Sequence, residues 1–161
     1  MSILWSSSSL KKLVNACSSK EWEASGVEID SRKVKKGDLF CAINGKSYNG
    51  HDFINSASEG GATACLISDN LINTKKVTLV KVNNVLDTLE RMAKNARMRS
   101  KAKFIAVTGS VGKTGTKDMM HLALSKVAST YSNESSYNNH LGVPLSLARV
   151  PPNLNYCVLE I

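Results

Sequence analysis

Hydrophobic and polar positions follow two different periods along this chain, and each period predicts a different kind of element. Short apolar runs between turn residues predict strands, whereas apolar positions at i, i+3, i+4 and i+7 predict helices with one buried face. The predicted strands are 27–29, 39–43, 63–67, 77–82, 104–107, 128–134 and 155–161. The predicted helices are 9–16, 51–58, 85–96 and one after residue 114 that buries Met120, Ala123, Leu124 and Val127.

Between the strand at 104–107 and the helix that follows lies a glycine-rich loop, Thr108-Gly109-Ser110-Val111-Gly112-Lys113-Thr114. A strand, a tight loop and a helix N-terminus form a phosphate-binding loop when backbone N–H groups and the helix dipole converge on one anion. Lys113 would then reach the β- and γ-phosphates of a nucleotide, and the Thr114 hydroxyl would hold Mg²⁺. Only two residues separate the glycines, whereas the common pattern has four. A glycine-containing turn followed by Lys-Thr by chance is the alternative.

The order of elements divides the chain into two parts. Residues 1–84 carry their own strands and predict a small α/β domain, with an α+β arrangement as the alternative. An amphipathic helix from residue 85 then links to a strand, the glycine-rich loop, a helix and further strands, the order of a parallel-sheet domain of the P-loop ATPase type. The predicted fold class is therefore α/β, with one domain over 1–84 and the beginning of a second over 85–161.

Composition and charge narrow the function classes only slightly. The 161 residues are 42% hydrophobic, enough for a globular core, and no apolar run reaches the length of a membrane span. The N-terminus has neither a basic region nor a sustained apolar stretch, so we expect no signal peptide and a cytoplasmic location. The net charge of +8 attracts anions, but the basic residues are scattered and aromatic residues are few. Charge therefore does not decide between nucleic acid and smaller phosphate-bearing ligands.

The cysteines point to a reducing compartment. Cys17, Cys41, Cys65 and Cys157 lie far apart, with no C-x-x-C spacing, and the last three sit in apolar runs that predict strands. We expect buried free thiols rather than disulfides or a zinc site.

Several loop segments carry further candidate binding groups. The segment Asp30-Ser31-Arg32 follows the first predicted strand, and the loop at 44–50 is dense in turn-forming residues. Asn138 and Asn139 lie in a stretch at 135–144 that we expect beside the carboxyl ends of parallel strands, where ligands bind in open α/β sheets. A plain Asn-rich turn is the alternative.

Two single residues need an explanation of their own. Glu160 interrupts the apolar strand at 155–161, and a carboxylate is expensive to bury unless it binds a cation or a hydrogen-bond donor. A second contact to Mg²⁺ explains it, whereas the alternative is a chain-end residue in water. His51 is expected to bond locally at the start of its helix rather than to act in catalysis or bind a metal.

Taken in order, these motifs resemble the Mur ligases, the ATP-dependent amide-forming enzymes of peptidoglycan precursor synthesis. The central match is the loop at 108–114, with its shortened glycine spacing. The other matching segments are Asp30-Ser31-Arg32, Gly37-Asp38-Leu39-Phe40-Cys41-Ala42, Asn49-Gly50-His51-Asp52-Phe53-Ile54, Asn138-Asn139-His140-Leu141-Gly142-Val143-Pro144-Leu145 and Val158-Leu159-Glu160. The loop with Lys117 downstream, together with Gly-Val-Pro-Leu at 142–145, is most similar to the members that add D-alanyl-D-alanine to a UDP-MurNAc-tripeptide.

The resemblance implies an amide ligation driven by ATP and Mg²⁺ through an acyl phosphate, with UDP-MurNAc-tripeptide and D-alanyl-D-alanine as substrates. It implies Lys113 and Glu160 as catalytic residues and Thr114 and Glu160 as Mg²⁺ ligands. The implied ATP-binding residues are Gly109, Ser110, Val111, Gly112, Lys113, Thr114 and Gly115, and the implied substrate-binding residues are Ser31, Arg32, Asn138 and Asn139. Neither a nucleic-acid partner nor membrane insertion is expected.

The chain departs from the family pattern in two ways. Family members are much longer, and this chain stops at Ile161, so we expect an N-terminal portion that is inactive alone and has an exposed sheet edge after its last strand. The missing C-terminal domains could lie on another chain. Gly115 stands where the family usually has Thr or Ser.

Other functions stay open at this point. The chain could be another P-loop protein such as a small kinase, or a Mur ligase that adds a single amino acid. It could also be a nucleotide-binding fragment without catalysis, or a basic nucleic-acid-binding module.

Overall fold

A computed structural model describes residues 2–45, 48–69, 74–134 and 140–161 of the chain. The chain folds as two compact units, Met1–Arg91 and Met92–Ile161, and each is described here by itself. The division falls inside helix α3 (Val85–Arg99), whereas the sequence predicts a boundary just before that helix.

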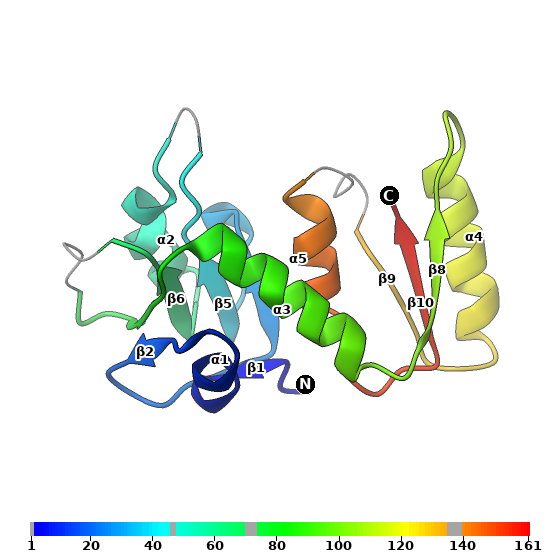
Figure 1. The fold of residues 1–161 in the computed structure, drawn as a ribbon. Coiled ribbons are helices and arrows are strands. Elements are labelled where there is room, and N and C mark those ends of the chain that lie inside the picture. Colours follow the sequence, from blue (N-terminus) through cyan, green and yellow to red (C-terminus); the bar gives the residue numbers. More distant parts are fainter. Residues whose placement is uncertain (1, 46–47, 70–73, 135–139) are drawn as a thin grey trace. The chain divides into compact units, whose positions relative to one another are not determined.

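The first unit is built on a sheet whose strand order, within the described residues, is β2-β7-β6-β5-β4 (Figure 1). The strands are β2 (Cys17–Ser18), β4 (Gly26–Glu28), β5 (Asp38–Cys41), β6 (Ala64–Ile67) and β7 (Thr78–Lys81). Strands β4 to β7 run parallel, and β2 pairs antiparallel with β7. Strand β6 is buried along its whole length, as expected for a parallel strand covered on both faces. The four strands predicted for this part of the chain are thus present, each within a few residues of its predicted bounds.

Short helices connect these strands and cover the sheet. They are α1 (Ser7–Val14), the 3₁₀ turns η1 (Ser31–Lys33) and η2 (Gly50–Phe53), and α2 (Ile54–Glu59). Strands β1 (Trp5–Ser6) and β3 (Glu23–Ala24) pair antiparallel outside the main sheet. Helix α1 begins earlier than predicted, because Ser6 and Ser9 form a capping box in which each side chain accepts a hydrogen bond from the other's N–H.

The second unit contains parallel strands in the order β8-β10-β9, as far as the described residues go (Figure 1). The strands are β8 (Lys103–Val107), β9 (Thr130–Ser132) and β10 (Tyr156–Glu160), joined by helices α4 (Lys113–Ser125) and α5 (Gly142–Ala148). The last strand is therefore the central one, and the sheet edges lie at β8 and β9. The sheet edge that the sequence led us to expect thus lies, among the described residues, at β8 and β9 and not at β10.

The face that α4 turns to the sheet differs from the predicted one. Ala123 and Val127 were expected to be buried, but both are exposed, Val127 to 76%. The residues of α4 with reduced exposure are Lys113, Lys117, Met120, His121 and Leu124, with Lys117 buried most deeply. The spacing of apolar residues predicted a buried face that is rotated about the helix axis relative to the observed one. The reason is that the buried Lys117 is polar and so was not counted among the apolar positions.

Helix α5 was not predicted from the sequence, because Gly142 and Pro144 resemble turn residues. Both lie in its first turn, where proline is tolerated since the N–H groups there have no partner within the helix.

The cysteines behave as the sequence predicts. Cys41, Cys65 and Cys157 are buried free thiols, and Cys17 is free and exposed. Burial raises the pKa of Cys65 and that of Cys157 to about 12, so both thiols stay neutral near neutral pH. Among the described residues, no helix is both long enough and apolar enough to cross a membrane.

Candidate functional site

The glycine-rich loop connects β8 to α4 through two backbone conformations that favour glycine. Gly109 has φ +147° and Gly112 has φ +76°, and Gly112 directly precedes the first residue of α4. A Cβ on Gly112 would meet no atom within 4 Å, so backbone conformation rather than space selects glycine there. Ser110 and Val111 between them are exposed, Val111 to 91%. The loop therefore offers its main chain to solvent at the N-terminus of a helix, where an anion is stabilised.

Lys113, the first residue of α4, folds back over this loop. Its Nζ donates a 2.7 Å hydrogen bond to the Gly109 carbonyl oxygen. An ammonium group has three N–H donors, so this bond leaves two for phosphate oxygens. The lysine ammonium thus lies against the glycine-rich loop.

Thr114 and Glu160, the two predicted metal ligands, meet at the carboxyl end of the sheet. The Thr114 hydroxyl donates a 2.8 Å hydrogen bond to Glu160 Oε2. Parallel pairing sets Glu160 opposite Val107, the last residue of β8, and so brings the carboxylate beside the loop. Glu160 is only 5% exposed, which excludes the alternative of a chain-end residue in water.

The donor set at this point fits Mg²⁺ bound together with a nucleotide. A carboxylate and a hydroxyl are hard oxygen ligands, and Mg²⁺ is usually held by one or two protein groups plus substrate phosphates and water. No cluster of three or more His, Cys, Asp or Glu side chains that could hold a metal occurs among the described residues. The two oxygen groups of Thr114 and Glu160 suit an ion that is shared with substrate phosphates.

Two residues that sequence reasoning did not assign to the site complete this arrangement. Asn133 accepts a 2.9 Å hydrogen bond from the Glu160 N–H at Oδ1 and donates a 3.2 Å bond from Nδ2 to the Glu160 carbonyl oxygen. Lys117 donates a 2.8 Å bond from Nζ to the Asn133 carbonyl oxygen. The position of Lys117, three residues after Thr114 on one helix, was a usable signal, whereas nothing local distinguishes Asn133.

Of the other predicted site residues in this unit, Gly115 is described by the structure and Asn138 and Asn139 are not. Gly115 lies within α4, and a Cβ there would meet no atom within 4 Å. Asn138 and Asn139 lie outside the described residues.

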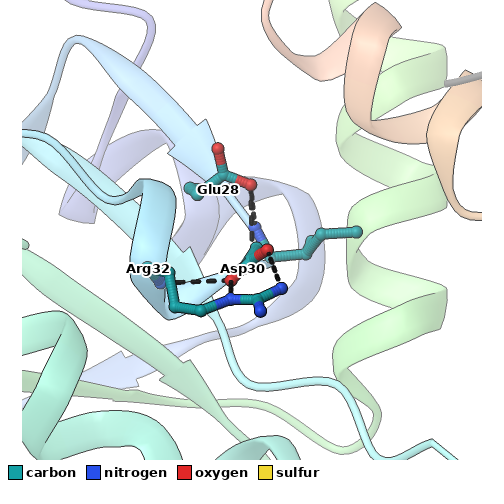
Figure 2. Close-up of polar contacts among 4 residues, drawn as sticks. Glu28, Asp30 and Arg32 are labelled. Carbon is teal, nitrogen blue, oxygen red and sulfur yellow. Dashed lines mark hydrogen bonds and ion pairs between the residues drawn. The ribbon is translucent and has the colours of Figure 1, made fainter. Parts of the chain in front are cut away.

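The first unit carries a second candidate site at the turn η1 (Figure 2). Asp30 accepts a 3.1 Å hydrogen bond from the Arg32 N–H, and its carboxylate also accepts bonds from Arg32 Nε at 2.9 Å and Nη2 at 2.7 Å. The Arg32 side-chain bond is the main cause that lowers the pKa of Asp30. The Arg32 side chain is nonetheless 85% exposed, so the guanidinium is oriented by Asp30 and open to a ligand. Ser31 is half-buried beside it.

Glu28 fixes the start of the same turn. Its Oε1 accepts hydrogen bonds from the N–H groups of Ile29 at 2.8 Å and Asp30 at 3.1 Å, as the dashed lines in Figure 2 show. A buried carboxylate therefore sets the main-chain path that presents Ser31 and Arg32.

The described residues of the loop at 44–50, which are 44–45 and 48–50, lie at the same sheet edge as η1, because they follow β5 and η1 follows the parallel neighbour β4. His51 anchors this loop: its Nδ1 lies 2.7 Å from Asn49 Oδ1 and 2.9 Å from Asn44 Oδ1. The Ser68 N–H donates a 3.0 Å bond to His51 Nε2, so the ring is neutral with its proton on Nδ1. The expectation of a local structural role for His51 is confirmed.

Comparison with known proteins finds one family over both units. Residues 23–97 match the Mur ligase family, catalytic domain, and residues 107–161 match the Mur ligase middle domain. A similar sequence is the UDP-N-acetylmuramoyl-tripeptide–D-alanyl-D-alanine ligase of Rickettsia prowazekii, 36% identical over 99% of this chain and 35% of the relative.

Solved structures that resemble this chain also include MurF ligases. MurF from Acinetobacter baumannii matches with a TM-score of 0.78 and 27% identity, over 98% of this chain and 35% of that one. MurF ligase from Thermotoga maritima in complex with ADP matches with a TM-score of 0.64 and 31% identity, over 84% of this chain and 31% of that one. The chain thus spans about a third of the length of these relatives.

Proposed function

This chain belongs to the Mur ligase family, and we propose that it supplies the nucleotide-phosphate site and the UDP-substrate site of an ATP-dependent ligase. In this proposal the complete enzyme joins D-alanyl-D-alanine to a UDP-MurNAc-tripeptide, as the names of the similar ligases suggest. The observation that carries the proposal is the Thr114–Glu160 hydrogen bond beside the Lys113 loop. A buried carboxylate and a hydroxyl set against a phosphate-binding loop suit a Mg-nucleotide.

The proposed reaction has two steps, a phosphoryl transfer and an attack by an amine on the resulting acyl phosphate. A carboxylate oxygen of the tripeptide attacks the γ-phosphorus of ATP, releasing ADP and leaving an acyl phosphate. The amine of D-alanyl-D-alanine then attacks the acyl carbon, loses a proton, and expels inorganic phosphate as the amide bond forms.

The residues of this chain would act mainly in the first step. Phosphoryl transfer depends on in-line positioning and on neutralising charge on the phosphate oxygens. The loop N–H groups would hold the phosphates, and Lys113 would place its ammonium against them. Thr114 and Glu160 would hold Mg²⁺, which when bound neutralises charge on the β- and γ-phosphates.

The first unit would hold the UDP-linked substrate. Ser31 and Arg32 would contact it from η1, and the loop at 44–50 would line the same edge of the sheet. The exposed, oriented guanidinium of Arg32 supports this assignment, because arginine suits bidentate recognition of phosphate. We place the reaction in the cytoplasm, where ATP and reduced thiols are available.

Phosphate release tests the proposal in the protein that carries this chain at its natural length. Release should require ATP, UDP-MurNAc-tripeptide and D-alanyl-D-alanine together. Release that instead requires UDP-MurNAc-dipeptide and a single diamino acid would identify a different ligase of the same family. ATP hydrolysis that responds to none of these substrates would overturn the ligase assignment.

A further inference from the structure

We propose that Lys117 and Asn133 are positioning residues that hold the Glu160 carboxylate against Thr114 in the arrangement a Mg-nucleotide requires. The inference rests on the proposed function, because it assigns a role in the same phosphate site. It concerns two residues that would touch neither the nucleotide nor the substrate.

The sheet itself explains why Glu160 needs Asn133. The β9–β10 pairing reaches only Ser132 and Val158, whereas β10 continues to Glu160. Beyond that point the Asn133 side chain takes the place of the missing strand, since its amide accepts from the Glu160 N–H and donates to the Glu160 carbonyl. On the other side Glu160 pairs with Val107 of β8. The N–H and C=O of Glu160 thus both bond to Asn133, and the next residue, Ile161, donates its N–H to the Val107 carbonyl at 3.1 Å.

Lys117 secures Asn133 from the helix. Its Nζ donates to the Asn133 carbonyl at 2.8 Å, and the Asp118 carboxylate lies 3.2 Å away with its side chain 63% exposed. Lys117 is 3% exposed, and burying an ammonium is costly where an apolar side chain would pack as well. A packing role alone therefore does not account for a lysine at this position.

These contacts close a ring around the site. Thr114 bonds to Glu160, Glu160 to Asn133, and Asn133 to Lys117, which returns to Thr114 through one turn of α4. The carboxylate and the hydroxyl that would share a metal ion are thus fixed by one connected set of bonds. Second-layer partners of metal ligands typically change metal affinity by about 10–100-fold when they are removed.

Two variants and a matched control test the inference in the protein at its natural length. Asn133→Leu removes both side-chain bonds to Glu160 at similar volume, and Lys117→Met keeps the stem but removes the ammonium. Tyr131→Phe is the control, because it removes a partly buried 3.2 Å bond from the Tyr131 hydroxyl to the Ser146 carbonyl in the same unit without touching Glu160.

The first measurement is hydrogen exchange, read by mass spectrometry on the peptide that ends β10. Both variants should speed exchange there, and the control should not. The second is the Mg²⁺ concentration that gives half-maximal phosphate release, which both variants should raise by about 10-fold or more. The ATP concentration needed at saturating Mg²⁺ should change much less.

The outcomes separate this inference from the proposed function. An unchanged Mg²⁺ requirement in both variants, or an equal rise in Tyr131→Phe, would overturn the positioning role even if the enzyme is a ligase. Faster hydrogen exchange without a change in the Mg²⁺ requirement would show that the bonds among Lys117, Asn133 and Glu160 stabilise the strand but do not affect Mg²⁺ binding, which would also overturn the positioning role. Failure of the unmodified protein to release phosphate would reject the proposed function, and the role in Mg²⁺ binding with it.

Discussion

The Thr114 hydroxyl and the Glu160 carboxylate are joined by a 2.8 Å hydrogen bond across 46 positions of sequence. One lies in the first turn of α4, and the other ends the central strand β10. The fold therefore sets these two oxygen groups side by side at the glycine-rich loop. Preorganisation of this kind reduces what binding must spend on ordering side chains.

Lys113→Ala should weaken Mg-ATP binding by about 1.5–3 kcal/mol, the usual worth of a hydrogen bond to a charged group. The fold should change little, because the Lys113 ammonium bonds to the Gly109 carbonyl in an exposed loop. Calorimetric titration with Mg-ATP measures the effect. Lys126→Ala is the control, since it removes the same charge from an exposed position just after α4. Equal affinity of Lys113→Ala and the unmodified protein would take Lys113 out of the site.

Arg32→Ala should weaken binding of a UDP-MurNAc-peptide by roughly tenfold or more, because a charge-assisted contact is lost. Mg-ATP binding should stay the same, since the proposed nucleotide site belongs to the other unit. Lys12→Ala removes a comparable exposed charge from α1 and should affect neither ligand. NMR titration locates the response, and UDP-peptide shifts confined to the region of Gly112 would contradict the assignment.

The buried ring of His51 should make stability depend on pH. Desolvation lowers the pKa of His51 in the folded state, against the opposing influence of Asp69 and Asp52. As pH falls below about 6.5, the unfolded chain gains a proton that the folded one resists, so stability should decrease. Above that pH both states are neutral at this residue and the effect vanishes.

The measurement for His51 is urea unfolding between pH 7.5 and 5.5. His51→Gln should be less stable at pH 7.5, because the bonds to Asn44, Asn49 and Ser68 are disturbed. Its stability should also vary less with pH, by at most about 1.4 kcal/mol per pH unit relative to the unmodified protein. Parallel pH profiles for the two proteins would show that His51 is not the titrating group.

The chain of 161 residues should not complete the ligation alone. An acyl phosphate must be shielded from water and an amine held against it, and a closing domain commonly supplies both. The chain spans about a third of its relatives, so that enclosure is expected from the rest of the protein. Phosphate release from purified chain, with ATP, muramyl tripeptide and D-alanyl-D-alanine, is the test. Turnover that depends on both substrates would show that the remaining segments are dispensable.

The features predicted correctly from sequence are local ones. The strand, loop and helix around Gly109 and Gly112 follow from apolar spacing and from glycines that allow positive φ. The turn that carries Ser31 and Arg32 lies directly after β4, as predicted, because the Asp30 side chain bonds to a neighbour two residues away. The buried cysteines and the local bonding of His51 were likewise evident from their immediate surroundings.

The features that only the tertiary structure decided are those that depend on which distant segments pair. Parallel strands are joined by long crossovers, so no turn in the sequence sets their order or register. The central place of β10, the burial of Lys117 instead of Val127, and the two bonds from Asn133 to Glu160 all follow from that pairing. By itself the sequence determined the chemical groups at the site, because spacing and residue type are local. The tertiary structure decided which groups hold them in place, because those contacts join residues that only the folded sheet brings together.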